Sequence, residues 1–554
     1  MEVFMRRFSA LFLIGSLGAA GCGAERPADT IALDGGDDSA TDSGSGFEIG
    51  DPDAAIDLGP SLDSLALAPL NATIFIDTTT GKAATQAYTA TLGPDDVTTK
   101  ATFTVDDPTL GSFSGATFTS ALTLPGSTLG ATTIVRASAE GKSGDAKLTI
   151  VKIRRTPDAT GKKDFFFTVP YMKAPDPPKD VLKFSTNIQK VDVAFAMDTT
   201  GSMSGSITNL KSSLTSVVVP GLAAKIPSVG MAVVDHRDWG DAWVVKVLQK
   251  ITTTTSLVNT AVGKMAPGGG GDYAEAQIAT LDYILTGNAN GTIPKVTPPA
   301  GHFGAVEFRP GAVPVVVLIT DAPWHDPSGS ATTATVTAGF KAKNVKFVNV
   351  NVGSKGGVAQ ANTLSDATAS NLLPAAFAGK CTAGQCCTGY KGAGIAPDSA
   401  GGRCRLNFDG GSGDGVSDSI VTAIQAISVG STYDITAQLS NDPTNKASDG
   451  AAVDATKFIE SIRAMKEGDA SLGCPANATY DADKDGIDDT FKAVTVGTPV
   501  CFEIIPKMNA TVKPSAGAQF FNAFIDMVGM PGGVNLGDKR TVVFLVPPED
   551  PGIK

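Results

Sequence analysis

The sequence is short of basic residues and of the residue patterns that carry catalysis. Its 554 residues contain 44 Lys and Arg against 56 Asp and Glu, and the formal net charge is −12. This balance argues against binding to nucleic acid and against binding to anionic lipid by charge. We find no G-x-S-x-G elbow, H-E-x-x-H motif or P-loop. The composition fits a secreted protein that holds divalent cations, and we expect no enzyme activity.

The apolar stretch near the N-terminus, residues 8–20, is too short to cross a bilayer and predicts a signal peptide over residues 1–21. Small residues stand directly before Cys22, an arrangement that resembles the signal of bacterial lipoproteins. The resemblance implies lipidation of Cys22. Because Gly23 follows instead of Asp, it also implies sorting to an outer membrane or the bacterial cell surface. The alternative is an ordinary secretory signal.

Shifts in composition divide the next part of the chain. Residues 22–60 are rich in Asp, Gly and Ser, which predicts a disordered acidic linker. Residues 61–153 hold short, alternating runs separated by turns, which predicts a β-sandwich. This segment resembles a bacterial immunoglobulin-like domain and could serve as a spacer or as an adhesive module. Residues 154–186 form a connecting segment that contains DFFFTVPYM, a strand-like run in need of a partner.

Two further domains are expected beyond this segment. Residues 187–430 alternate strand and helix patterns, as a parallel sheet with crossover helices should. Residues 431–554 turn β-rich again and predict a second sandwich, to which DFFFTVPYM could contribute a strand. The predicted fold class is therefore multidomain, α/β plus all-β.

Three loops of the α/β segment carry the candidate chemistry. The buried run VDVAFAMD ends at Asp198 and is followed by Thr200 and Ser202 at alternate positions. A second apolar run, VVVLIT, ends at Asp321, and between the two lies the loop PGGGGDYAEA. The carboxyl ends of parallel strands meet at one edge of a sheet, where open α/β sheets bind ligands. The alternative is that these residues merely cap helices.

These motifs resemble the D-x-[ST]-x-S signature and acidic loops of von Willebrand factor A-type (VWA) domains. The resemblance implies a Rossmann-like domain with a metal-ion-dependent adhesion site that holds Mg²⁺, or Mn²⁺ or Ca²⁺, and leaves a position open for an acidic side chain of a partner. The D-x-x-E loop resembles the integrin β-subunit version, which implies Glu275 as a ligand and Asp272 at the metal or beside it. An integrin β-like head, with the VWA domain inserted in a sandwich, is also implied. The predicted ligands are Asp198, Thr200, Ser202, Asp272, Glu275 and Asp321.

Four of the seven cysteines lie in an insertion at residues 380–405. Their spacing lacks the paired C-x-x-C knuckles of structural zinc, and an exported protein meets an oxidising compartment, so two disulfides are favoured over zinc. Cys386 and Cys387 are adjacent and should bond to Cys381 and Cys404, in an order that the sequence leaves open.

The C-terminal segment carries the two remaining cysteines, Cys474 and Cys501, which we expect to pair with each other. It also contains an Asp-rich loop at residues 481–489, whose D-x-D-x-D-G spacing converges oxygens on one Ca²⁺. Lys492 stands where an EF-hand needs Glu, and the loop more closely resembles thrombospondin type-3 calcium loops. The alternative is a solvated acidic turn. The predicted calcium ligands are Asp481, Asp483, Asp485, Asp488 and Asp489.

Together these features predict a cell-surface lipoprotein that binds a protein, matrix or cell-surface ligand through a metal ion and meets the membrane only through its lipid. One alternative is a metal-dependent hydrolase that uses the same carboxylates with His236 or His325 as a base or zinc ligand. A second is a structural scaffold whose metal only stabilises the fold.

Overall fold

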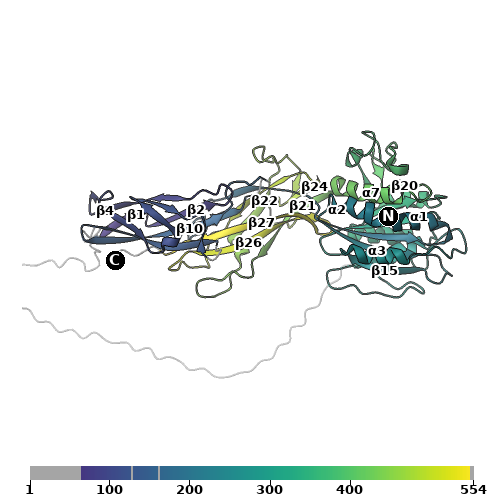
Figure 1. Ribbon diagram of the computed structural model, residues 1–554, viewed down its shortest axis with the longest axis horizontal. Helices are drawn as coiled ribbons and strands as arrows, with labels where there is room; N and C mark the ends of the chain where they lie inside the picture. The colour runs from purple at the N-terminus through teal and green to yellow at the C-terminus, as the bar shows by residue number, and fades with distance from the viewer. Residues whose placement is uncertain (1–63, 126–128, 160–162, 550–554) are drawn as a thin grey trace, which may run out of the picture. The chain divides into compact units, whose positions relative to one another are not determined.

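The chain combines helices with strands that form several separate sheets, so the presence of both α and β structure in the predicted fold class is confirmed. The computed structural model describes residues 64–125, 129–159 and 163–549, within the unit Pro60–Lys554 (Figure 1). The expected signal peptide, Cys22 and the linker lie outside the described residues. Of the helices in the described ranges, none is long and apolar enough to span a membrane.

The N-terminal part is built from strands in three sheets, ordered β1-β4-β5, β2-β10-β9-β6 and β3-β8-β7. Buried and more exposed side chains alternate along β2, as expected for a strand with one face in a core. Its buried residues include Ala72, Ile74 and Ile76. The strands are β1 (Leu65–Ala68), β2 (Asn71–Asp77), β3 (Thr85–Ala87), β4 (Thr89–Leu92), β5 (Asp95–Asp96), β6 (Thr102–Val105), β7 (Gly111–Ser114), β8 (Thr117–Ser120), β9 (Gly130–Ala139) and β10 (Lys142–Ile153).

The C-terminal part forms a six-stranded sheet, β11-β27-β26-β21-β24-β23, and a three-stranded sheet, β12-β25-β22. Figure 1 shows β21, β26 and β27 side by side. The strands are β11 (Phe165–Thr168), β12 (Asp180–Phe184), β21 (Thr432–Asn441), β22 (Ile459–Ala464), β23 (Thr479–Tyr480), β24 (Thr490–Thr495), β25 (Val500–Pro506), β26 (Gln519–Met530) and β27 (Val534–Val546).

Two of these strands come from far upstream. β11, the centre of the DFFFTVPYM run, pairs in parallel with β27, and β12 pairs antiparallel with β25. Phe165 and Phe167 are completely buried, and the Phe167 ring stacks on Phe544 at 5.9 Å between centroids. All residues between β12 and β21 are therefore inserted into a C-terminal β unit whose strands come from both sides of the insertion.

The inserted segment is organised around one six-stranded sheet, ordered β15-β14-β13-β16-β17-β20, in which only β15 runs antiparallel to its neighbour. Its strands are β13 (Lys190–Asp198), β14 (Ser228–His236), β15 (Val245–Thr252), β16 (Val313–Thr320), β17 (Lys346–Asn351) and β20 (Asn407–Asp409). All eight residues of β16 are buried, as expected for a strand covered on both faces.

Helices cover both faces of this sheet. One face of β13, which includes Val193 and Phe195, packs in a core with side chains of α1, α3 and α7. The opposite face of β13, which includes Ala194 and Ala196, packs in a second core with side chains of α4, α5 and α6. The helices are α1 (Ser204–Ser213), α2 (Val219–Ala223), α3 (Thr255–Lys264), α4 (Gln277–Thr286), α5 (Thr333–Lys343), α6 (Val358–Ala367) and α7 (Val416–Gly430).

A buried charge pair lies at the start of the central strand. Asp192 has no exposed surface, and its carboxylate accepts hydrogen bonds from the backbone N–H and the Nε of Arg309, both at 2.7 Å. Burial raises the pKa of Asp192, and the Arg309 guanidinium opposes that rise. A buried carboxylate is tolerated here because it is paired and hydrogen-bonded.

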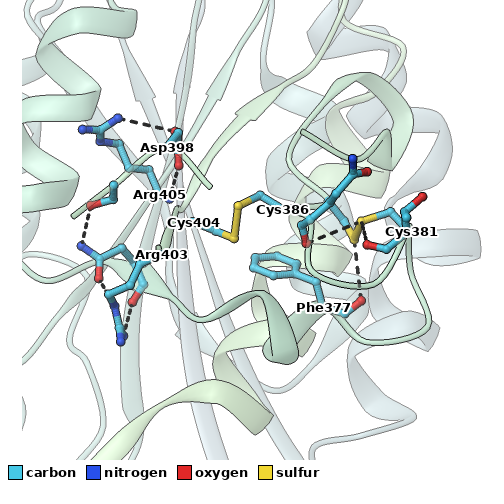
Figure 2. Close-up of a disulfide and its surroundings, with 12 residues drawn as sticks. Phe377, Cys381, Cys386, Asp398, Arg403, Cys404 and Arg405 are labelled. Atoms are coloured by element: carbon cyan, nitrogen blue, oxygen red, sulfur yellow. Dashed lines mark hydrogen bonds and ion pairs between the residues drawn. A yellow bond between two sulfur atoms is a disulfide. The ribbon is translucent and has the colours of Figure 1, made fainter. Parts of the chain in front are cut away.

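The expected disulfides are present, and the open pairing in the 380–405 insertion is settled. Cys381 bonds to Cys387, and Cys386 bonds to Cys404, which begins the short strand β19 (Cys404–Arg405) opposite β18 (Asn371–Leu372). Figure 2 shows the ring of Phe377 beside the Cys386–Cys404 bridge. The third disulfide joins Cys474 to Cys501.

Candidate metal centre

The end of β13 supplies the first pair of oxygens. Asp198 is buried, and its Oδ1 accepts hydrogen bonds from the backbone N–H of Thr200 at 2.9 Å and from its hydroxyl at 2.6 Å. The chain then turns into a single 3₁₀ turn, Gly201–Met203, before α1 begins. The tight turn after the strand therefore holds the carboxylate and the hydroxyl together.

The end of the neighbouring strand β16 supplies the second pair. The hydroxyl of Ser202 donates to Asp321 Oδ1 at 3.1 Å, and Asp321 is only 9% exposed. Thr320, the residue before Asp321, donates to Asp198 Oδ2 at 2.8 Å and so links the two strand ends. Sequence reasoning missed Thr320; its position directly before the second acidic residue was the available signal.

The glycine-rich loop brings Glu275 to the same place. A Cβ built on Gly270 would lie 3.2 Å from Thr200 Cβ and 3.3 Å from Glu275 Oε1, so the loop backbone passes close to both side chains. Gly269 and Gly270 have φ of +82° and +88°, a region that favours glycine. Asp241 anchors the loop, because the N–H of Gly270 donates to its Oδ2 at 3.0 Å.

The electrostatics of this group call for an added positive charge. Asp198, Glu275 and Asp321 are all buried, and no Lys or Arg within the described ranges forms an ion pair with any of them. Burial and the nearby Asp198 raise the pKa of Glu275 to about 8, and burial also raises the pKa of Asp321. Oε2 of Glu275 is buried and has no hydrogen-bond partner among the described residues.

The donor set fits a hard divalent cation. The five side chains Asp198, Thr200, Ser202, Glu275 and Asp321 offer only carboxylate and hydroxyl oxygens, which Mg²⁺, Mn²⁺ and Ca²⁺ prefer. They come from the ends of two adjacent parallel strands and from one loop, and the contacts above connect them. Ser202 is exposed, so one side of the group is open to solvent.

Asp272, the sixth predicted ligand, lies beside this group in a different cluster. Its side chain is 62% exposed, and its Oδ1 lies 3.6 Å from Nε2 of His325. The same nitrogen lies 3.3 Å from Oδ1 of Asp238, a buried residue in the loop after β14. Sequence reasoning did not select Asp238, although it stands in the DHRDWGD run that also contains His236.

His236 and Trp324 are packed inside the protein. His236 is completely buried at the end of β14, opposite Asp198 in the strand register, and burial lowers its pKa. Neither of its ring nitrogens has a hydrogen-bond partner among the described residues.

Trp324 is 4% exposed and packs edge-on against Phe347. Trp239 is partly buried, and its indole N–H donates to Ser328.

The Asp-rich loop of the C-terminal part gathers carboxylates at the surface. One oxygen from each of Asp481, Asp483 and Asp485 lies within 4.8 Å of the other two. Asp481 accepts from the backbone N–H groups of Lys484 and Gly486, which lowers its pKa. The side chains of the other two predicted ligands turn to local partners: Asp488 accepts from Thr479, and Asp489 accepts from the N–H of Ala482.

Comparison with known proteins adds little to this geometry. No family model matches the chain, and no curated protein matches it. Among solved structures, proximal thread matrix protein 1 from the mussel byssus aligns with 48% of this chain and 52% of its own, at 13% identity and a TM-score of 0.27. The chain thus spans about half the length of that protein, and a likeness this weak carries no argument about fold or function.

Proposed function

We propose that this protein is a bacterial cell-surface lipoprotein, anchored through Cys22, whose inserted α/β segment is a VWA-type binding domain. In this proposal Asp198, Thr200, Ser202, Glu275 and Asp321 hold one Mg²⁺, with Mn²⁺ or Ca²⁺ as substitutes. The bound ion supplies an open coordination position for a carboxylate of a protein or matrix ligand.

The observation that carries the proposal is the group of three buried carboxylates without a described cationic partner. Burying a carboxylate without a nearby cation is costly, and a bound cation would remove that cost. The hydroxyls of Thr200 and Ser202 lie next to these carboxylates, and the buried Oε2 of Glu275 has no hydrogen-bond partner in the described part of the chain. A divalent cation bound beside these hydroxyls would neutralise negative charge of the carboxylates and would give that oxygen a partner.

Each group has a separate role in this proposal. Asp198 orients the Thr200 hydroxyl, and Thr320 fixes the other oxygen of Asp198. Ser202, on the exposed side, marks the direction from which a ligand approaches. The hydroxyls of Thr200 and Ser202 add oxygen ligands without adding further negative charge.

The two alternative functions are a metal-dependent hydrolase and a structural scaffold. A hydrolase that uses His236 as a base would need that imidazole to reach a substrate, whereas it is completely buried. His325 is more accessible, but its Nε2 faces two carboxylates. A scaffold whose metal only stabilises the fold predicts that the chelated protein unfolds, while the binding proposal predicts a folded protein without ligand affinity.

The test measures Mg²⁺ binding by titration calorimetry and ligand capture from envelope and matrix extracts, each with and without EDTA. We expect capture to require Mg²⁺ and to be lost in the Asp198→Asn variant, with an unchanged circular dichroism spectrum. The matched control is Asp409→Asn, which alters a carboxylate at the end of β20 that pairs with Lys355. Mg²⁺-dependent capture that persists in Asp198→Asn would contradict the proposal.

A further inference from the structure

A second cluster of metal-binding side chains lies next to the oxygen-only group, and it contains a nitrogen. Oδ1 of Asp238, Oδ1 of Asp272 and Nε2 of His325 are supplied by three different loops, and the cluster's ligand atoms lie within 4.8 Å of one another. We propose that these three side chains bind a transition-metal ion of the Zn²⁺ class, separate from the ion held by Asp198.

The distances favour a shared ion over a direct ion pair. Nε2 of His325 lies 3.3 Å from Asp238 and 3.6 Å from Asp272. Charge-assisted N–H···O bonds are about 2.7–2.9 Å long. Two ligands that are each about 2.0–2.1 Å from a tetrahedral Zn²⁺ lie about 3.3 Å apart. The separations therefore match the edges of a coordination tetrahedron better than a hydrogen bond.

A second, independent feature points to a ligand. Asp238 is 5% exposed, and its Oδ1, the atom that faces His325, is buried and receives no hydrogen bond from the described part of the chain. A buried acceptor without a donor destabilises the folded protein, and more so when it is charged. A bound cation would remove that destabilisation.

The loops that carry the three side chains are tied to one another by backbone hydrogen bonds. The N–H of Glu275 donates to Pro323 at 3.0 Å, and the N–H of His325 donates to Glu275 at 3.0 Å. The N–H of Ala276 donates to Arg237 at 3.3 Å, next to Asp238. These bonds position the cluster before any ion binds, which reduces the entropy cost of binding.

The chemistry of the donors separates the two sites. Imidazole together with carboxylates suits Zn²⁺, Co²⁺ and Ni²⁺, whereas the oxygen-only group suits Mg²⁺. Three protein ligands leave a fourth position of the tetrahedron for water or a partner's side chain. Asp272 has the most exposed side chain of the three, at 62% against 31% for His325, so the cluster is open to solvent on its side.

In the first measurement, the metal-free full chain is titrated with Zn²⁺ in the presence of excess Mg²⁺ and Ca²⁺, which occupy the oxygen-only sites. In the second, Co²⁺ binding is followed by its visible absorption. We expect His325→Ala to lower Zn²⁺ affinity at least about 100-fold, the upper end of what loss of a metal's outer-shell partner causes. His302→Ala is the matched control, since His302 lies outside the cluster, and should bind Zn²⁺ as the unmodified protein does.

Asp198→Asn distinguishes this proposal from the proposed function: it should lose Mg²⁺ affinity and keep Zn²⁺ affinity. If His325→Ala does not fold, Asp272→Asn at the exposed position takes its place and should also weaken Zn²⁺ binding and alter the Co²⁺ spectrum. Unchanged Zn²⁺ affinity in the folded His325 or Asp272 variant, or an equal loss in His302→Ala, would overturn the assignment.

Discussion

We expect Glu275 to make the proposed Mg²⁺ binding depend on pH. Its pKa is raised from an ordinary 4.5 to about 8, with burial as the main cause and the charge of Asp198 as the second. At pH 7 about nine-tenths of metal-free molecules therefore carry a proton on Glu275. Because Mg²⁺ binds the carboxylate and not the acid, we expect each ion bound at pH 7 to release about 0.9 proton.

The same pKa sets the size of the pH effect. The deprotonated fraction of Glu275 rises from about 0.01 at pH 6 to about 0.5 at pH 8, so the apparent affinity for Mg²⁺ should rise about 50-fold over that interval. In the metal-free protein, the raised pKa of Glu275 makes the free energy of unfolding decrease with rising pH, whereas the Mg²⁺ affinity increases. The folded state holds a proton that the unfolded state loses above about pH 4.5, so stability falls as the pH rises from there towards 8.

Calorimetry in two buffers of different ionisation enthalpy measures the released proton directly. In Glu275→Gln the release and the pH dependence should both disappear, together with much of the affinity. Glu460→Gln, which alters an exposed glutamate paired with Lys507, should release protons as the unmodified chain does. Mg²⁺ binding with the same affinity at pH 6 and pH 8 would refute the reasoning.

Other parts of the molecule allow equally direct measurements. Arg309→Ala should destabilise the inserted domain by about 3–5 kcal/mol in urea unfolding, because it leaves the buried charge of Asp192 unpaired; a loss below about 1 kcal/mol would show that the charge is compensated otherwise. Phe167→Ala should cost about 3–5 kcal/mol in the C-terminal sheets, since its ring is buried against β27, and full stability would contradict that packing. Asp483→Asn should weaken any Ca²⁺ binding at the 481–489 loop about tenfold, because ligand charge sets the affinity of such loops. Calorimetry with Ca²⁺ checks this, and an unaltered isotherm would favour a solvated acidic turn.

The carboxyl edge of the central sheet could be predicted from the sequence because strand ends are local signals. The dense apolar runs before Asp198 and Asp321 predict buried parallel strands, and parallel strands end at one edge. That argument places the two carboxylates near each other without any knowledge of the helices.

The neighbouring cluster could not be predicted in the same way. Asp238 and His325 are 87 positions apart on loops whose paths follow from backbone hydrogen bonds such as that between His325 and Glu275. Contacts between such loops leave no periodic pattern of residues in the sequence. The pairing of Cys386 with Cys404 is similar, because the adjacency of two cysteines limits their partners but does not select between them.

The insertion between β12 and β21 has a consequence for biosynthesis. The N–H of Ser185, just after β12, binds Asp538, which lies 353 residues further along the chain. At about 5–20 residues per second, a ribosome needs about 20–70 s to make that interval. During this time Phe165, Phe167 and Phe184 have no finished sheet to enter. The nascent protein therefore exposes an aromatic, aggregation-prone segment until translation reaches the last strands.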